Sequence, residues 1–137
     1  MNILLADDIE GWLKFNKSYL EKFLNNKDLK FYTFPSASDA YDFAFTFNEK
    51  IDLVVTDLEM EYMYDEPAGA WLIENLKNTK STKNARYIII SGSYDIKFVA
   101  EEKGADGYIR KATFRNYPET LQTLLNELFG VQNEIKG

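Results

Sequence analysis

The chain has 137 residues, 45% of them apolar and 15% aromatic, which is typical of a single compact globular domain. Its 22 acidic and 16 basic residues give a net charge of −6, which disfavours binding to nucleic acid and to anionic membrane surfaces. The absence of cysteine and histidine excludes disulfides, zinc sites built on these ligands, and triads that need an imidazole base. The first residues lack the basic and long apolar segments of a secretion signal, so we expect a cytoplasmic protein.

Short apolar runs alternate with segments of helical periodicity along the chain. The predicted strands cover residues 3–6, 31–34, 53–56, 87–90 and 107–109. The predicted helices cover residues 10–25, 68–77, 95–103 and 118–130. A further helix should follow a capping pair of Ser36 and Asp39 and run to residue 47. Polar residues 25–28 should break the first helix, Gly104 should end the fourth, and Pro118 suits the first turn of the last. This alternation predicts a doubly wound α/β fold, with helices on both faces of a parallel sheet.

Ionisable and hydroxyl side chains follow the predicted strands where the strands end. Asp7 and Asp8 follow the first strand, Asp57 the third, Ser91 the fourth and Lys111 the fifth. The carboxyl ends of parallel strands lie along one edge of a sheet, so we expect these side chains to lie close together. Neighbouring carboxylates repel one another, and a divalent cation together with Lys111 would balance their charge. Carboxylate oxygens suit Mg²⁺, which proteins usually hold together with phosphate oxygens.

Asp57 is the best candidate nucleophile, because it stands alone at the end of the central strand while Asp7 and Asp8 form a pair that can hold a metal ion. A carboxylate that attacks an activated phosphoryl group forms an aspartyl phosphate. Such transfer depends mainly on positioning and charge neutralisation, which Mg²⁺, Ser91 and Lys111 would supply. Taken singly, each residue has an ordinary explanation: Asp7 and Asp8 could cap the first helix, and Lys111 could be a surface lysine. Their joint occurrence at one edge favours the functional interpretation.

Four motifs, in this order and at these spacings, resemble the receiver domain of two-component response regulators. They are Leu4-Leu5-Ala6-Asp7-Asp8, Val54-Val55-Thr56-Asp57-Leu58-Glu59-Met60, Ile88-Ile89-Ile90-Ser91-Gly92 and Gly104-Ala105-Asp106-Gly107-Tyr108-Ile109-Arg110-Lys111. The resemblance covers nearly the whole chain and implies a single-domain receiver of the chemotaxis-regulator type, with the flavodoxin-like strand order 2-1-3-4-5. It also implies one domain over residues 1–137, with a core over about 2–129, a short tail over 130–137 and no output domain.

The resemblance assigns expected roles to individual residues. It implies that Asp57 accepts a phosphoryl group from a histidine kinase or a histidine phosphotransfer protein. It implies that Mg²⁺, for which Mn²⁺ could substitute, is bound by Asp8, Asp57 and the main-chain carbonyl of Glu59, and that Asp7 reaches the metal through water. It also implies that Lys111 pairs with the phosphoryl group and that Ser91 and Tyr108 act as the switch. Glu59 and Ser93 would tune the lifetime of the phosphorylated state. A downstream protein would read that state on the surface of the fourth helix, fifth strand and fifth helix.

Three differences from the usual family pattern concern the loops of the site. Glu61 stands after Met60 where the family usually has proline, and the next glycine is Gly69, so the loop is several residues longer than usual. Ala112 replaces the proline that usually follows the lysine in a cis peptide bond. We predict a trans bond and a slightly re-aimed Lys111, because a cis bond before a non-proline residue costs about 2.5–4 kcal/mol. Gly92 replaces the usual alanine after the switch hydroxyl, which should keep the phosphate site open and loosen the loop.

Three functions compete. The favoured one is a phospho-acceptor signalling module without an independent enzyme activity beyond its own phosphorylation and dephosphorylation. The second is a receiver-like protein that binds partners without phosphorylation, which Ala112 and the long loop favour; residues 62–64 could form a partner-binding lip or a self-packed loop. The third is a small hydrolase of the haloacid dehalogenase type. Those enzymes need Asp-x-Asp at the nucleophile, whereas the sequence here is Asp57-Leu58-Glu59.

Overall fold

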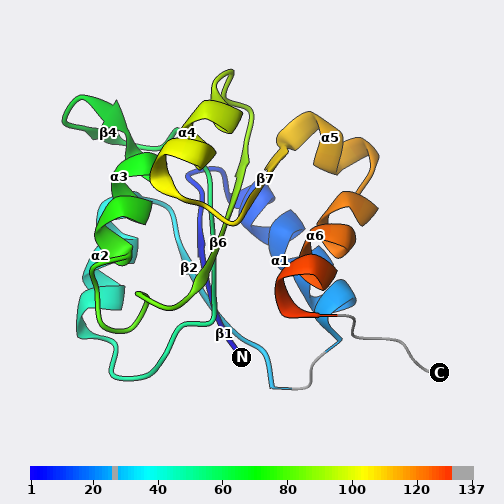
Figure 1. Cartoon of the computed structure of the whole chain (residues 1–137), viewed down its shortest axis with the longest axis horizontal. Coiled ribbons are helices and arrows are strands. Elements are labelled where there is room, and N and C mark those ends of the chain that lie inside the picture. Colours follow the sequence, from blue (N-terminus) through cyan, green and yellow to red (C-terminus); the bar gives the residue numbers. More distant parts are fainter. Residues whose placement is uncertain (26–27, 131–137) are drawn as a thin grey trace.

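The computed structural model, which describes residues 1–25 and 28–130, contains a five-stranded parallel sheet. The sheet lies between two layers of helices (Figure 1). The strands of this sheet are β1 (Asn2–Ala6), β2 (Lys30–Phe34), β3 (Leu53–Thr56), β6 (Arg86–Ser91) and β7 (Gly107–Arg110). Their spatial order is β2-β1-β3-β6-β7, and every neighbouring pair is parallel. Counted within this sheet alone, the order is 2-1-3-4-5, so the predicted doubly wound, flavodoxin-like fold is confirmed.

Helices cover both faces of the sheet. One layer contains α1 (Glu10–Leu24), α5 (Lys111–Asn116) and α6 (Glu119–Phe129), and the other contains α2 (Ala37–Thr46), α3 (Ala68–Leu76) and α4 (Ile96–Lys103) (Figure 1). Two predicted helix signals are confirmed: Ser36 Oγ accepts the N–H of Asp39 at 3.1 Å, and Gly104 ends α4 with a φ of 71°. No helix within residues 1–25 and 28–130 is both long and apolar enough to cross a membrane.

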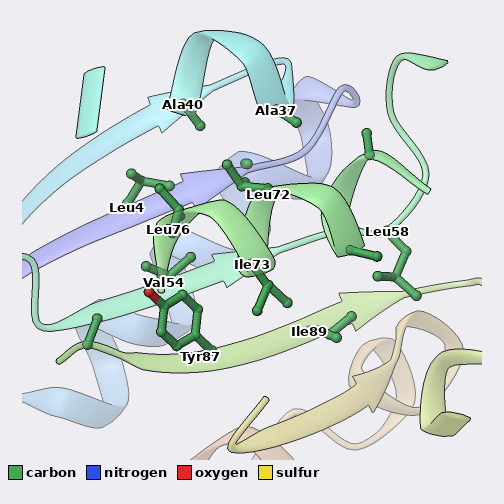
Figure 2. Packing of buried hydrophobic residues seen from close by; sticks show 14 of the residues in the cluster. Leu4, Ala37, Ala40, Val54, Leu58, Leu72, Ile73, Leu76, Tyr87 and Ile89 are labelled. Atoms are coloured by element: carbon green, nitrogen blue, oxygen red, sulfur yellow. The ribbon is translucent and has the colours of Figure 1, made fainter. Parts of the chain in front are cut away.

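Two apolar clusters fill the spaces between the sheet and its helical layers. Figure 2 shows the cluster beneath α2 and α3, where Leu4, Val54 and Ile89 of three strands meet Leu72 and Ile73 of α3. Successive residues of a strand point to opposite faces, so the neighbours of these strand residues belong to the second cluster, beneath α1, α5 and α6. Burial on both sides explains the continuous apolar runs of the central strands. It also holds their carboxyl ends side by side, where the functional side chains follow.

Two segments differ from the sequence predictions. The loop after β3 contains a short antiparallel hairpin of β4 (Tyr62–Met63) and β5 (Glu66–Pro67), with Tyr64 at its turn in a left-handed conformation with a φ of 57°. Residues 111–116, for which no helix was predicted, form α5. The segment is too short to show helical periodicity in the sequence, and one fully buried residue, Phe114, anchors it. The predicted tail over residues 131–137 and part of the predicted break, residues 26–27, lie outside the described residues.

Gly69 lies where α3 passes against the end of β3. Its N–H donates to the Leu58 carbonyl at 2.9 Å, and a Cβ built on Gly69 would lie 2.0 Å from the carbonyl oxygen of Asp57. Backbone atoms cannot rotate aside as the end of a flexible side chain can, so only glycine fits this approach. The first glycine after Asp57 is therefore the point where the chain returns from the hairpin to the edge of the sheet.

We expect Gly69→Ala to destabilise the protein by about 2 kcal/mol or more, because the added methyl group would push α3 away from the Asp57 carbonyl. Gly11→Ala is the matched control. Gly11 lies in α1 with nothing within 4 Å of a built Cβ. Alanine there should stabilise the helix by about 0.5–1 kcal/mol. Urea denaturation measures both changes, and equal stability of Gly69→Ala and the wild type would contradict the close approach.

Candidate functional site

The five side chains predicted to gather at the carboxyl edge of the sheet do lie there. Asp7 and Asp8 follow β1, Asp57 follows β3, Ser91 ends β6, and Lys111 begins α5 directly after β7. A pocket over this edge is lined by Asp8, Asp57, Ser91 and Lys111 together with Trp12 and Glu59. The parallel topology, rather than closeness in sequence, brings these groups together.

Lys111 forms ion pairs with two buried carboxylates. Its Nζ lies 2.9 Å from Asp57 Oδ2 and 3.0 Å from Asp7 Oδ2. The other oxygen of Asp57, Oδ1, accepts the main-chain N–H groups of Leu58 and Glu59 at 2.7 and 3.4 Å. The Lys111–Ala112 bond is trans, as predicted, since the described residues contain no cis peptide bond. The lysine nevertheless reaches the candidate nucleophile.

The site holds more negative than positive charge. Carboxylate oxygens of Asp7, Asp8 and Asp57 all lie within 4.8 Å of one another. Burial, together with the charge of Asp57, raises the pKa of Asp7, although Lys111 and the N–H of Ile9 oppose this shift. Burial disfavours the charged form of Lys111, but its bonds to Asp57 and Asp7 prevail and raise the pKa of the ammonium. Three carboxylates against one ammonium leave two negative charges in excess, which is compatible with a divalent metal ion.

The predicted capping role of the acidic pair is partly present. Asp7 Oδ1 accepts the N–H of Ile9 at 2.9 Å, just before α1 begins, whereas no side chain caps α1 at Ile9 itself. The other oxygen, Asp7 Oδ2, is buried and faces Lys111. Asp7 therefore binds the main chain before α1 with one oxygen and faces the charged site with the other. Asp8 is exposed.

Ser91 and Ser93 connect the end of β6 to the loop after β3. Ser91 Oγ is buried and accepts the N–H of Ser93 at 3.1 Å, so its own hydroxyl proton remains for a group in the pocket. Ser93 Oγ lies 3.1 Å from a carboxylate oxygen of Glu59 and 3.1 Å from one of Asp95. One oxygen of the Glu59 carboxylate is thus engaged with Ser93, at the wall of the same pocket.

Tyr108 lies on β7, the edge strand of the sheet beside β6. It is 37% exposed, whereas its neighbour Ile109 is buried in the core. Tyr108 therefore lies at the surface of the sheet edge, and its role as a switch stays a prediction.

Glu61 has a role that the sequence did not predict. Its carboxylate accepts the N–H groups of Ala37 and Ser38 at 2.8 Å each and the Ser38 hydroxyl at 2.9 Å, at the first turn of α2. Partial burial opposes ionisation, but these bonds hold the pKa of Glu61 below its usual range. The sequence shows an acid in place of the usual proline, but it does not show that this acid binds Ala37 and Ser38, which lie 24 and 23 positions away.

The hairpin that follows Glu61 carries two exposed tyrosines. Tyr62 is 85% exposed and Tyr64 is 73% exposed, whereas Met63 packs against the core. Lys103 of α4 holds the base of the hairpin through an ion pair of 3.0 Å with Glu66, and it also pairs with Glu74 of α3. Met63 thus packs on the core of the domain, while the exposure of the two tyrosines leaves the partner-binding lip a prediction.

We expect Asp7→Asn to stabilise the metal-free protein by about 1 kcal/mol at neutral pH, because it removes a buried charge beside Asp57. The raised pKa of Asp7 means that the folded state binds this proton more tightly than the unfolded chain. The advantage of the variant should therefore shrink as the pH falls through the folded-state pKa. Thermal denaturation in EDTA over a pH series measures it, with Asp8→Asn as the exposed control. A lower Tm for Asp7→Asn at neutral pH would contradict this expectation.

We expect Glu61→Gln to destabilise the protein by about 1 kcal/mol at neutral pH, because a neutral amide caps α2 less strongly than a carboxylate. The lowered pKa of Glu61 fixes the sign of the pH dependence: its contribution is present above the unfolded-state pKa and is lost as the pH falls through the folded-state pKa. The two proteins should thus become equally stable in acid. Asp65→Asn, in the same hairpin, is the matched control in urea denaturation. A deficit of Glu61→Gln that does not change with pH would rule out this charge-dependent cap.

No protein-family model and no curated protein matches the chain. Among solved structures, a response regulator receiver domain protein from Clostridium thermocellum is 26% identical, with a TM-score of 0.70 over 95% of this chain and 93% of that chain. A receiver domain from Rhodospirillum rubrum is 18% identical, with a TM-score of 0.74 over 100% of both chains. A CheY-like receiver domain protein from Methanospirillum hungatei JF-1 is 22% identical, with a TM-score of 0.62 over 92% of this chain and 97% of that chain. The chain therefore has the fold of response regulator receiver domains, and the resemblance indicated by its motifs is confirmed.

Proposed function

We propose that this protein is a phospho-acceptor signalling module of a two-component system or phosphorelay, in which Asp57 takes a phosphoryl group from a phosphohistidine of a partner protein. The observation that carries this proposal is the geometry at the sheet edge. The Asp57 carboxylate reaches the pocket, pairs with Lys111 at 2.9 Å, and lies within 4.8 Å of carboxylate oxygens of Asp7 and Asp8. The fold, shared with solved receiver domains, supports the same conclusion.

The donor set of the site fits Mg²⁺. It offers oxygen ligands only, and two negative charges are left in excess over Lys111. In addition, the buried Asp7 Oδ2 has no well-aligned hydrogen-bond donor within the described part of the chain, although Lys111 Nζ lies 3.0 Å away. Asp8, Asp57 and the main-chain carbonyl of Glu59 would hold the ion, with Asp7 reaching it through water. When bound, Mg²⁺ would neutralise charge on the transferring phosphoryl group.

The residues of the chain supply the remaining parts of the reaction. An oxygen of the Asp57 carboxylate attacks phosphorus and forms the new P–O bond, while the P–N bond of the phosphohistidine breaks and its electron pair leaves with the imidazole. Lys111, now bonded to Asp57 Oδ2, would pair with an oxygen of the arriving phosphoryl group. The oxygen of Ser91 already accepts the Ser93 N–H, so the Ser91 hydroxyl would donate its proton to a second oxygen of the phosphoryl group. Positioning and charge therefore do most of the work.

The phosphorylated state would be read by another protein. Tyr94 and Phe98 at α4 are 95% and 63% exposed, and Tyr108 of β7 is 37% exposed. Exposed aromatic side chains of this kind are frequent in protein interfaces. They lie on the side of the sheet edge where Ser91 would bond the phosphoryl group, so a change at Ser91 can be passed to Tyr108 and α4. The cognate kinase would dock on the same edge, over the pocket.

The alternative is an interaction module that works without phosphorylation. The long hairpin with its exposed Tyr62 and Tyr64 suits partner binding in either case. A hydrolase is disfavoured, because the acid two positions after Asp57 is Glu59 and its carboxylate is bonded to Ser93.

We expect incubation with acetyl phosphate and Mg²⁺ to add one phosphoryl group to the wild type, measured as intact mass. Asp57→Asn should remove the adduct completely, and EDTA should slow its formation at least tenfold. Asp65→Asn makes the same substitution at an acid outside the pocket, and it should leave the adduct and its rate of formation unchanged.

Two other outcomes separate the alternatives. A wild type that gains no phosphoryl mass at any Mg²⁺ concentration would leave the phosphorylation-independent module as the better explanation. Turnover of an added phosphomonoester would instead support a hydrolase.

A further inference from the structure

Lys111 reaches its partners without the proline that usually follows this lysine in receiver domains. Ala112 stands in that position and its peptide bond is trans. The preceding residue, Arg110, ends β7 and caps α5 without a side-chain hydrogen bond to the helix. Even so, the Lys111 side chain is only 12% exposed and its ammonium pairs with Asp57 and Asp7. A flexible four-carbon stem needs contacts from elsewhere to be held in one place.

The first such contact is an aromatic anchor between α5 and α1. Phe114 of α5 is fully buried. Its ring centroid lies 5.0 Å from that of Phe15, 5.7 Å from that of Tyr19 and 6.4 Å from that of Trp12, all on α1. A helix of six residues is not stable alone, so this packing against α1 determines where α5 lies. Lys111 is the first residue of that helix, so the packing of α5 against α1 also sets the position of the Lys111 main chain.

The second contact acts on the charged end of the side chain. Lys111 Nζ lies 5.0 Å from the centroid of the Trp12 ring, within the range of a cation–π interaction. The guanidinium carbon of Arg115 lies 5.2 Å from the same centroid. Trp12 also lines the pocket that contains Asp57, whereas its neighbour Phe15 makes ring contacts with Trp12, Tyr19 and Phe114. Trp12 therefore differs from the other rings of the cluster by facing the ammonium at the site.

We propose that Trp12 is a positioning residue for Lys111: its indole ring holds the ammonium against Asp57 and Asp7, and so replaces the restraint that a following proline gives in the usual pattern. Without this ring, the stem of Lys111 would sample other rotamers, and the ammonium would be absent from the site for part of the time. The geometric part of this inference stands on the contacts alone, and its effect on phosphoryl transfer rests on the proposed function.

The test compares Trp12→Leu and Trp12→Phe with Phe15→Leu, which removes an aromatic ring from the same cluster without touching Lys111. We expect Trp12→Leu to slow phosphorylation of Asp57 by acetyl phosphate and Mg²⁺ by about fivefold to tenfold, with Asp57 still the acceptor. Trp12→Phe keeps a ring face and should recover most of the rate. Phe15→Leu should lose as much thermal stability as Trp12→Leu but keep most of the wild-type rate, because Tyr19 and Trp12 still pack on Phe114 and Trp12 still faces Lys111. An equal loss of rate in Phe15→Leu and Trp12→Leu would overturn the proposal, because general loosening of the cluster would then explain both.

A second measurement works even if the protein accepts no phosphoryl group. NMR of ¹³C-lysine-labelled protein should show the ε-methylene of Lys111, assigned by its loss in Lys111→Arg, shifted upfield by the ring of Trp12. The shift should vanish in Trp12→Leu and persist in Phe15→Leu. A wild-type signal at the position of solvent-exposed lysines would overturn the proposal. An upfield signal in a protein without any phosphoryl adduct would support the positioning contact and refute only the proposed function.

Discussion

The ion pairs of Lys111 with Asp57 and Asp7 are the interactions on which the rest of the site depends. Both carboxylates are almost fully buried, and like charges at this separation repel strongly in a medium of low effective dielectric. The three residues directly follow three different strands, β1, β3 and β7, whose carboxyl ends only the parallel sheet brings to one edge. Lys111 makes it tolerable to bury two acids together, but its single charge leaves the three carboxylates with two negative charges in excess. The same imbalance that disfavours three ionised carboxylates at this edge makes the cluster compatible with a divalent cation.

The sequence predicted the sheet and the composition of this edge for physical reasons. Strands covered on both faces must be apolar throughout, and the runs that end at Asp7, Asp57 and Ser91 are the buried central strands of the sheet. Alternation with helices requires right-handed crossovers and thus parallel strands, which places the residues after them at one edge. Neither step needs knowledge of a distant contact. The helix ends at Ser36 and Gly104 followed in the same way from local chemistry.

The parts that could not be predicted depend on contacts between distant segments. The hairpin strands have two residues each and α5 has six, which is below the length at which a hydrophobic period can be recognised. Their positions are instead fixed by single contacts: Met63 and Glu66 hold the hairpin, and Phe114 holds α5. The roles of Glu61 and Trp12 were missed for the same reason. A glutamate and a tryptophan each fit many environments, and only the fold shows that one caps α2 and the other faces Lys111.

Glu61 and Trp12 act at the two places where this chain lacks a proline of the usual pattern. A proline restrains a loop covalently, largely by limiting the conformations of the unfolded chain, and its effect does not require a neighbouring element. Here the loop after Asp57 is held by the N-terminus of α2, and the start of α5 is held by the rings of α1. These contacts exist only while α1 and α2 are packed on opposite faces of the sheet. The geometry around Asp57 therefore depends on both helical layers, so loosening either layer would change the site without altering any residue that lines it.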